Sequence, residues 1–330
     1  MNDQTLRSPI PTHSTNSINS TNSAQFGWEI PNGNRRMPSD IREYIPRVRR
    51  MLDRISGHFH SAWIPDHFMN DRQDNFPESL TTLSYLAGLY PNLHFGPVVL
   101  GQNYRNPALL AKMAATLQML SGGRFVLGLG AGWHVDEYRA YNFEFPGAAA
   151  RIAQLAEAVQ ICKLMWDPAQ PTATFHGQHY RVDGAACFPK PQPPPPVMIG
   201  GAGEKLMLRV VARHADWWNL VGVSPETYAR KIRVLENHCA GVGRNPAGIR
   251  RTWMGVVSIA ATRRQAEAAL ARYPIWPEDV AIVGTPEEVT ARLREYTALG
   301  VDLFIVAFAD EPAFDGLELF IRDVMPEFEV

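Results

Sequence analysis

The chain has 330 residues, of which 45% are hydrophobic, and its 32 basic and 33 acidic side chains give a formal net charge of -1. This length and composition allow a large core, either in one barrel or in two ordinary domains. The near-neutral charge argues against nucleic acid or an anionic membrane as a main partner, and the apolar runs are too short to span a bilayer.

Three cysteines, Cys162, Cys187 and Cys239, are scattered along the chain with no Cys-x-x-Cys spacing. Such a set is neither a disulfide framework nor a zinc site, so we expect a cytoplasmic protein. Residues 1–24 are rich in Ser, Thr and Asn and lack the apolar segment of a secretory signal. We expect them to form a disordered tail, followed by a single domain over residues 25–330.

From residue 25 onward, short apolar runs alternate with longer amphipathic segments, as strands alternate with helices in α/β proteins. The predicted strands cover residues 26–30, 61–64, 94–100, 125–129, 197–199, 217–221, 252–260 and 302–308. The predicted helices cover residues 40–55, 78–89, 106–120, 147–166, 204–214, 225–240, a segment from residue 262, 286–299 and 317–324. Pro46 lies within the first helix and predicts a kink or a later start.

Residues 167–196 interrupt this alternation. They include residues 172–182, which predict a two-stranded excursion, and they end in a run of prolines. A long insertion of this kind is more often a functional lid than filler. Eight strands, each followed by a helix, favour a (β/α)8 TIM barrel with this insertion between strands 4 and 5. A doubly wound sheet is the alternative fold, although at this length it would more usually split into two domains.

Residues 119–138 predict a helix end, a tight turn, a buried strand and a glycine-rich loop. Gly128-x-Gly130-x-Gly132 looks like a dinucleotide-binding fingerprint, but the third glycine of GxGxxG would fall at Trp133. Loops that follow barrel strands carry the chemistry of this fold, although the glycines can also serve tight packing alone. The loop contains Trp133, His134, Asp136 and Glu137. Trp133 is the candidate to stack on a planar ring.

Two other strand ends carry candidate site residues. Asp66 and His67 follow the second strand, where a neutral histidine could act as a general base and an adjacent carboxylate could tune it. Residues 200–203 join a strand to a helix, and their glycines could expose backbone N–H groups to a phosphate. Tight turns also use glycine, so this loop is equally compatible with a structural role.

Histidine pairs raise the alternative of a metal-dependent barrel hydrolase. His58 and His60 precede their strand, which places them at the wrong end of the barrel for such a site. His176 and His179 lie within the insertion. We therefore predict no metal site.

With these residues assembled, the chain resembles the bacterial-luciferase-like (LLM class) family of flavin- and deazaflavin-dependent oxidoreductases. The resemblance extends from about residue 25 to residue 308. The matching patches are residues 63–68, 104–112, 120–124, 128–133, 137–138, 199–203 and 215–219. Together these patches are highly specific, whereas none would be alone.

The resemblance implies a flavin-type ring at the C-terminal end of the barrel, with His67 as the catalytic, proton-handling residue. It also implies that Val98-Val99 is where the family often has a non-proline cis peptide against the ring. The implied cofactor-binding residues are Asp66, Val98, Val99, Trp133, Asp136, Gly200, Gly201, Ala202 and Gly203. Some deazaflavin enzymes of the family carry Glu at the position of Trp133, so no acid role is expected there.

The family combines two chemistries, and the resemblance is closer to the deazaflavin branch. We therefore expect hydride transfer between coenzyme F420 and a small organic substrate. The alternative is an FMNH2-dependent monooxygenase, similar to alkanesulfonate monooxygenases, that uses O2 and a partner flavin reductase. The resemblance also suggests a homodimer. From the near-neutral charge and the short apolar runs we expect neither nucleic acid nor membrane as a partner.

Overall fold

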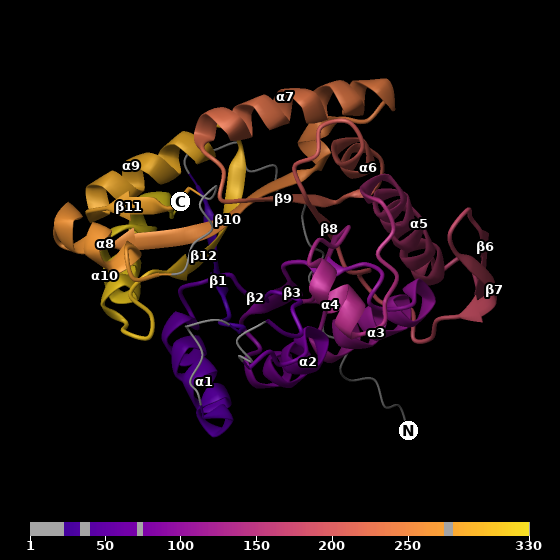
Figure 1. Cartoon of the computed structure of the whole chain (residues 1–330), viewed down its shortest axis with the longest axis horizontal. Helices are drawn as coiled ribbons and strands as arrows, with labels where there is room; N and C mark the ends of the chain where they lie inside the picture. Colours follow the sequence, from indigo (N-terminus) through magenta and orange to yellow (C-terminus); the bar gives the residue numbers. More distant parts are fainter. Residues whose placement is uncertain (1–22, 34–39, 71–74, 274–279, 330) are drawn as a thin grey trace, which may run out of the picture.

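The computed structural model describes residues 23–33, 40–70, 75–273 and 280–329, and parallel strands form its centre (Figure 1). The strands of the central sheet run in the order β3-β2-β1-β12-β10-β9-β8-β5-β4, and every neighbouring pair is parallel. Their bounds are β1 (Gln25–Glu29), β2 (Ser61–Ile64), β3 (His94–Pro97), β4 (Leu100–Gly101), β5 (Leu127–Gly130), β8 (Val197–Gly200), β9 (Trp217–Val221), β10 (Arg250–Ile259) and β12 (Val301–Phe308).

The sheet curves until its two ends meet. Its terminal strands β3 and β4 are consecutive in the chain, and Phe95 of β3 forms a parallel bridge with Phe125 just before β5. The Phe95 N–H donates to the Arg124 carbonyl at 2.9 Å, and the Val126 N–H donates to the Phe95 carbonyl at 2.9 Å. The predicted TIM barrel is therefore confirmed.

Helices surround the strands (Figure 1). Their bounds are α1 (Tyr44–Ile55), α2 (Ser79–Leu89), α3 (Pro107–Leu120), α4 (Val135–Ala140), α5 (Ala148–Trp166), α6 (Met207–His214), α7 (Pro225–Gly241), α8 (Arg263–Leu270), α9 (Pro286–Thr297) and α10 (Asp315–Asp323). Short 3-10 helices cover Ile41–Glu43, Pro246–Gly248 and Met325–Phe328. A short strand, β11 (Ile282–Gly284), extends the sheet beside the end of β10.

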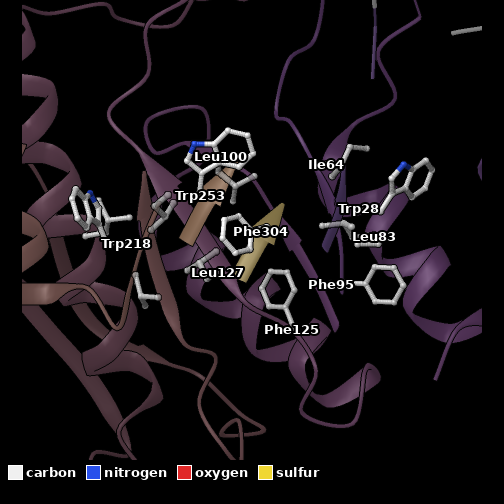
Figure 2. Packing of buried hydrophobic residues seen from close by; sticks show 14 of the residues in the cluster. Trp28, Ile64, Leu83, Phe95, Leu100, Phe125, Leu127, Trp218, Trp253 and Phe304 are labelled. Carbon is white, nitrogen blue, oxygen red and sulfur yellow. The ribbon is translucent and has the colours of Figure 1, made fainter. Parts of the chain in front are cut away.

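Strand side chains alternate between two apolar clusters, as the two-residue period of a strand requires. The larger cluster joins the outer faces of the strands to the helices, and Figure 2 shows some of its members, among them Ile64, Leu83 and Phe304. The smaller cluster fills the interior of the barrel with Trp63, Val98, Val126, Met198, Met254, Leu303 and Ile305. The barrel interior is therefore packed, and a ligand site has to lie at an end of the barrel.

Several predicted elements have different boundaries in the structure, and two of these differences have a clear local cause. The predicted strand over residues 94–100 is divided into β3 and β4 at a cis peptide bond between Val98 and Val99. The predicted first helix begins later than residue 40, because residues 41–43 form a 3-10 turn and α1 starts at Tyr44. Pro46 consequently lies in the first turn of α1, where its missing N–H breaks no helical hydrogen bond. The later start that Pro46 predicted is confirmed.

The insertion forms the predicted two-stranded hairpin, β6 (Thr172–His176) paired with β7 (Arg181–Ala186). It lies beside α5 at the edge of the molecule (Figure 1). The Glu157 carboxylate of α5 accepts hydrogen bonds from the backbone N–H groups of residues 178, 179 and 180 at 2.7, 2.9 and 2.9 Å. The Tyr180 hydroxyl also donates to Gln102 after β4 at 3.0 Å. These contacts attach the hairpin to α5 and to the residue that follows β4, and the role of the insertion as a functional lid stays a prediction. The predicted disordered tail, except residues 23 and 24, lies outside the described residues.

Candidate active site

The loops after β2 and β5 bring three rings together at the C-terminal end of the barrel, which we call the mouth. His67 follows β2, and Trp133 and His134 follow β5. The ring centroids are 5.4 Å apart for His67 and Trp133, 5.7 Å for His67 and His134, and 5.0 Å for Trp133 and His134. Trp133 is 57% exposed. Residues from two distant parts of the chain thus form one partly open aromatic group.

A buried carboxylate holds His67 in place. The Glu137 side chain, in the first turn of α4, is fully buried, and its Oε2 lies 3.1 Å from His67 Nδ1. The same carboxylate accepts hydrogen bonds from the Phe68 N–H at 2.7 Å and the Tyr104 hydroxyl at 2.8 Å. Burial alone would raise the pKa of Glu137, but the hydrogen bonds from His67, Phe68 and Tyr104 outweigh it and hold the pKa below its usual value. The site therefore contains an anionic Glu137 that faces one nitrogen of His67.

The sequence predicts Glu137 to lie in the loop and indicates no role for it. The missed signal is a helix start, because His134 is the N-cap of α4 and Glu137 stands three residues later. Asp136, which was assigned a role, has a side chain that is 70% exposed and lies 3.6 Å from Arg139. Consecutive residues on a helix differ by roughly 100° in direction, so α4 directs Glu137 inward and Asp136 toward solvent. The contact predicted between Asp136 and a cofactor stays a prediction.

Asp66 is already engaged within the chain. Its buried carboxylate pairs with both terminal nitrogens of Arg105 at 2.8 Å, and it accepts from the Ser79 hydroxyl at 2.6 Å and the Gly101 N–H at 3.2 Å. Arg105 also pairs with Glu78. These contacts fasten the loop after β2 to the start of α2, to β4 and to the segment that precedes α3. The predicted contact of Asp66 with a cofactor ring stays a prediction, whereas its anchoring of the His67 loop is visible.

The cis peptide bond at Val98-Val99, which the resemblance implied, is present at the mouth. Val99 lies between the ends of β5 and β8, beside two glycines. A Cβ atom added to Gly130 would lie 2.7 Å from a Val99 methyl carbon, and one added to Gly200 would lie 3.1 Å from it. These two glycines therefore leave room for Val99, which gives them a packing role in addition to any role toward a ligand.

The predicted phosphate loop follows β8 and contains Gly200, Gly201, Ala202 and Gly203. Gly201 has a φ angle of 146°, and a Cβ atom there would lie 2.8 Å from Met207 Cγ, so glycine is required. The loop is fixed by Trp218 Nε1, which donates to the Gly201 carbonyl at 3.0 Å, and by His238 Nε2, which lies 2.7 Å from the Glu204 carbonyl. Because Glu204 is held in this turn, α6 begins at Met207 instead of residue 204. No described side chain caps the N-terminus of α6.

The remaining histidines lie away from the mouth. His60 stacks on His94 at the N-terminal end of the barrel, with 4.3 Å between the ring centroids, and His176 pairs with Asp183 in the hairpin. Within the described residues, no three His, Cys, Asp or Glu side chains are grouped so that they could hold a metal ion. In the same part of the chain, no helix combines the length and apolar character needed to cross a membrane.

A groove at the N-terminal end of the barrel is lined by Trp166, Trp217 and Arg250, among other residues. It lies at the end of the barrel opposite His67 and Glu137. In barrel enzymes that end serves stability, whereas the loops at the mouth carry the chemistry. We therefore place the candidate active site at the mouth.

The fold and this mouth define a barrel oxidoreductase of the luciferase-like class. The chain belongs to the luciferase-like monooxygenase family, whose sequence model matches residues 24–278. The F420-dependent glucose-6-phosphate dehydrogenase of Amycolatopsis mediterranei is 31% identical over 182 residues, which cover 54% of this chain and 50% of that protein. The chain thus spans about half the length of that relative. The enzyme of the same name from Segniliparus rotundus is 26% identical over 81% of this chain and 89% of its own length.

Solved structures agree with the barrel. An F420-dependent secondary alcohol dehydrogenase, in complex with an F420-acetone adduct, matches 93% of this chain and 100% of its own with a TM-score of 0.79 and 18% identity. The FMN-bound oxygenating component of a 3,6-diketocamphane monooxygenase from Pseudomonas putida matches 93% of this chain and 99% of its own, with a TM-score of 0.73 and 17% identity. At these identities the likeness shows the fold alone. The predicted family and the oxidoreductase class are confirmed, and F420 is the cofactor that the relatives' names carry.

Proposed function

We propose that this protein transfers a hydride between coenzyme F420 and a small organic substrate, and that His67 handles the substrate proton. The observation that carries this proposal is the buried, anionic Glu137 beside His67 Nδ1 at the barrel mouth. The names of the curated relatives support F420 as the cofactor. Trp133 supplies a half-exposed aromatic face beside this pair.

His67 is oriented so that one nitrogen remains available for the reaction. An anionic carboxylate favours a proton on the nitrogen that faces it, so Nδ1 carries the proton and Nε2 keeps its lone pair. Among the described residues, no hydrogen-bond partner occupies Nε2. His67 Nε2 can therefore take the hydroxyl proton of an alcohol, and it can return that proton when a carbonyl is reduced.

The mouth fits a deazaflavin in two respects. The loop at residues 200–203 leads into the N-terminus of α6, where no described side chain caps the free backbone N–H groups, and such a terminus suits the cofactor's phosphate. Because Gly201 has no side chain, a phosphate could approach the backbone of the loop closely. Val98, Val99 and Trp133 would lie against the ring, with Asp66 and Asp136 as further predicted contacts. When bound, the deazaflavin supplies the atom that accepts or returns the hydride.

An FMNH2-dependent monooxygenase is the second candidate function. It is favoured by Trp133, which replaces the Glu of some deazaflavin enzymes, and by the FMN-bound monooxygenase of the same fold. That activity would need O2 and a flavin reductase as a partner.

We further propose that the protein is a cytoplasmic homodimer with no nucleic acid or membrane partner. Light scattering after size exclusion would test the oligomeric state.

Turnover with and without oxygen separates the two functions. The purified protein is supplied with oxidised F420 and a panel of small secondary alcohols under nitrogen, and the loss of F420 absorbance is followed. We expect at least one alcohol to reduce F420 without oxygen. Product formation that requires both FMNH2 and O2, with no F420 reduction across the panel, would contradict the proposal in favour of the monooxygenase.

A further inference from the structure

Glu137 contacts two histidines through two different groups. Its carboxylate faces His67 Nδ1 at 3.1 Å, and its backbone N–H is shared between the His134 carbonyl at 3.0 Å and His134 Nδ1 at 3.4 Å. The second contact is the N-cap of α4, in which the histidine ring takes the place usually held by Ser, Thr, Asp or Asn. Glu137 thus contacts Nδ1 of both imidazole rings, but as an acceptor toward His67 and as a donor toward His134.

The two contacts impose different tautomers. A ring nitrogen that accepts a hydrogen bond from a backbone N–H must offer a lone pair, so neutral His134 carries its proton on Nε2. A ring nitrogen that faces an anionic carboxylate carries the proton, so neutral His67 offers its lone pair at Nε2. Within the described part of the chain, neither Nε2 atom has a hydrogen-bond partner.

We propose that Glu137 sets His67 and His134 in opposite tautomers, so that His67 Nε2 accepts a proton from the substrate oxygen while the His134 Nε2–H donates a hydrogen bond to the same oxygen. Two nitrogens that share one oxygen lie within roughly 6 Å of each other, a span that the 5.7 Å between the ring centroids allows. The substrate class that fits is an alcohol and carbonyl couple. The catalytic part of this inference rests on the proposed function, whereas the tautomers belong to the protein alone.

The reaction balances with these roles. In alcohol oxidation the O–H bond breaks and its proton moves to His67 Nε2. The C–H bond breaks, and its hydrogen leaves with both electrons to the oxidised deazaflavin, which is thereby reduced. The oxygen then forms the carbonyl double bond and continues to accept from the His134 Nε2–H. His134 keeps its proton throughout, so it is a hydrogen-bond donor and His67 is the base.

Nitrogen NMR of the apoprotein tests the tautomers without any cofactor. Histidine-labelled protein is recorded at about pH 8, above the ordinary histidine pKa of about 6.5. The spectra of His67→Gln and His134→Ser identify the two residues. We expect His67 to be protonated on Nδ1 and His134 on Nε2. The same tautomer in both rings, or a proton on His134 Nδ1, would overturn the inference.

Glu137→Gln separates the two contacts. The backbone N–H remains, so His134 should keep its tautomer. The side-chain amide can either donate or accept, so His67 should become a mixture of tautomers. A change of tautomer at His134 with none at His67 would contradict the assignment of these contacts.

Kinetics test the donor role. His134→Ser keeps a capping oxygen but removes the ring, so F420 affinity should stay within about threefold, while kcat for alcohol oxidation falls about 100-fold. His176→Gln is the matched control, because this exposed hairpin histidine pairs with Asp183 far from the mouth, and its kcat should stay unchanged. Unchanged kcat in His134→Ser, or a loss confined to F420 affinity, would overturn the donor role. If wild-type protein reduces no F420 at all, the proposed function fails, and the NMR result still decides the tautomers.

Discussion

Strand β2 has a histidine beyond each end, and the two illustrate how surroundings decide what a side chain can do. His60 at the N-terminal end stacks on His94, and its Nδ1 is buried with no hydrogen-bond partner among the described residues. Burial, and to a smaller extent the positive charges of His94 and Arg250, lower the pKa of His60 to about 3. His67 at the other end faces the carboxylate of Glu137 and is 28% exposed in its side chain. A neutral packing residue and a proton-handling candidate thus lie seven positions apart.

The largest contrast should come from removing each ring in turn. His67→Ala should lower kcat for F420 reduction by about 1,000-fold, within the range expected for loss of a general base, with F420 affinity retained. His60→Ala should leave kcat unchanged and instead lower the free energy of unfolding. Steady-state kinetics and urea unfolding on both variants measure this contrast. Equal kcat losses in the two variants would remove the distinction between the two ends of β2.

The anchor of the His67 loop should contribute a large part of the stability of the mouth. Asp66→Asn leaves Arg105 buried and without that carboxylate, which should cost about 3 kcal/mol or more of the free energy of unfolding. The matched control is Asp136→Asn, because that carboxylate is exposed, and its loss should cost less than about 0.5 kcal/mol. Urea titration measures both. Similar costs for the two variants would contradict the buried Asp66–Arg105 pair.

The N-terminal end should make stability depend on pH. The folded pKa of His60 lies below its unfolded value of about 6.5, so the unfolded chain binds more protons between these values and stability falls as pH falls. From pH 7 to pH 5 we expect a loss of roughly 1–2 kcal/mol from this residue. Urea unfolding at several pH values measures it, and His60→Gln should have a flatter profile over the same window. An unchanged profile in that variant would show that His60 is not the group responsible.

Trp133 should give the smallest effect. Its side chain is half-exposed, so Trp133→Ala should barely change stability. Loss of one aromatic contact, worth about 0.5–1.5 kcal/mol, should weaken F420 binding two- to tenfold. Fluorescence titration measures the affinity. Unchanged affinity would show that Trp133 packs against the two histidines without contacting the cofactor.

Several features of the fold follow directly from local sequence. Three of the four residues 61–64 are apolar, and all four are buried in β2, as expected for a strand that is covered on both faces. The later start of α1 follows from the fixed backbone of Pro46. Other features depend on distant parts of the chain. The start of α6 at Met207 depends on Trp218 and His238, which hold the preceding loop from other elements.

The site likewise combines residues that local sequence reveals with one that depends on the folded structure. The sequence and the resemblance located His67, Trp133 and the cis peptide bond at Val98-Val99. The sequence pattern predicts a glycine-rich loop at Glu137, and without the helix start at His134 nothing in it distinguishes Glu137 from Asp136. Direction on a helix is set by where the helix begins, and here the cap is an unusual residue type.

The most direct test is a competition between F420 and FMN for the wild-type apoprotein, followed by fluorescence. We expect F420 to bind and to resist displacement by an equal concentration of FMN. FMN binding that excludes F420 would contradict F420-dependent hydride transfer at the mouth.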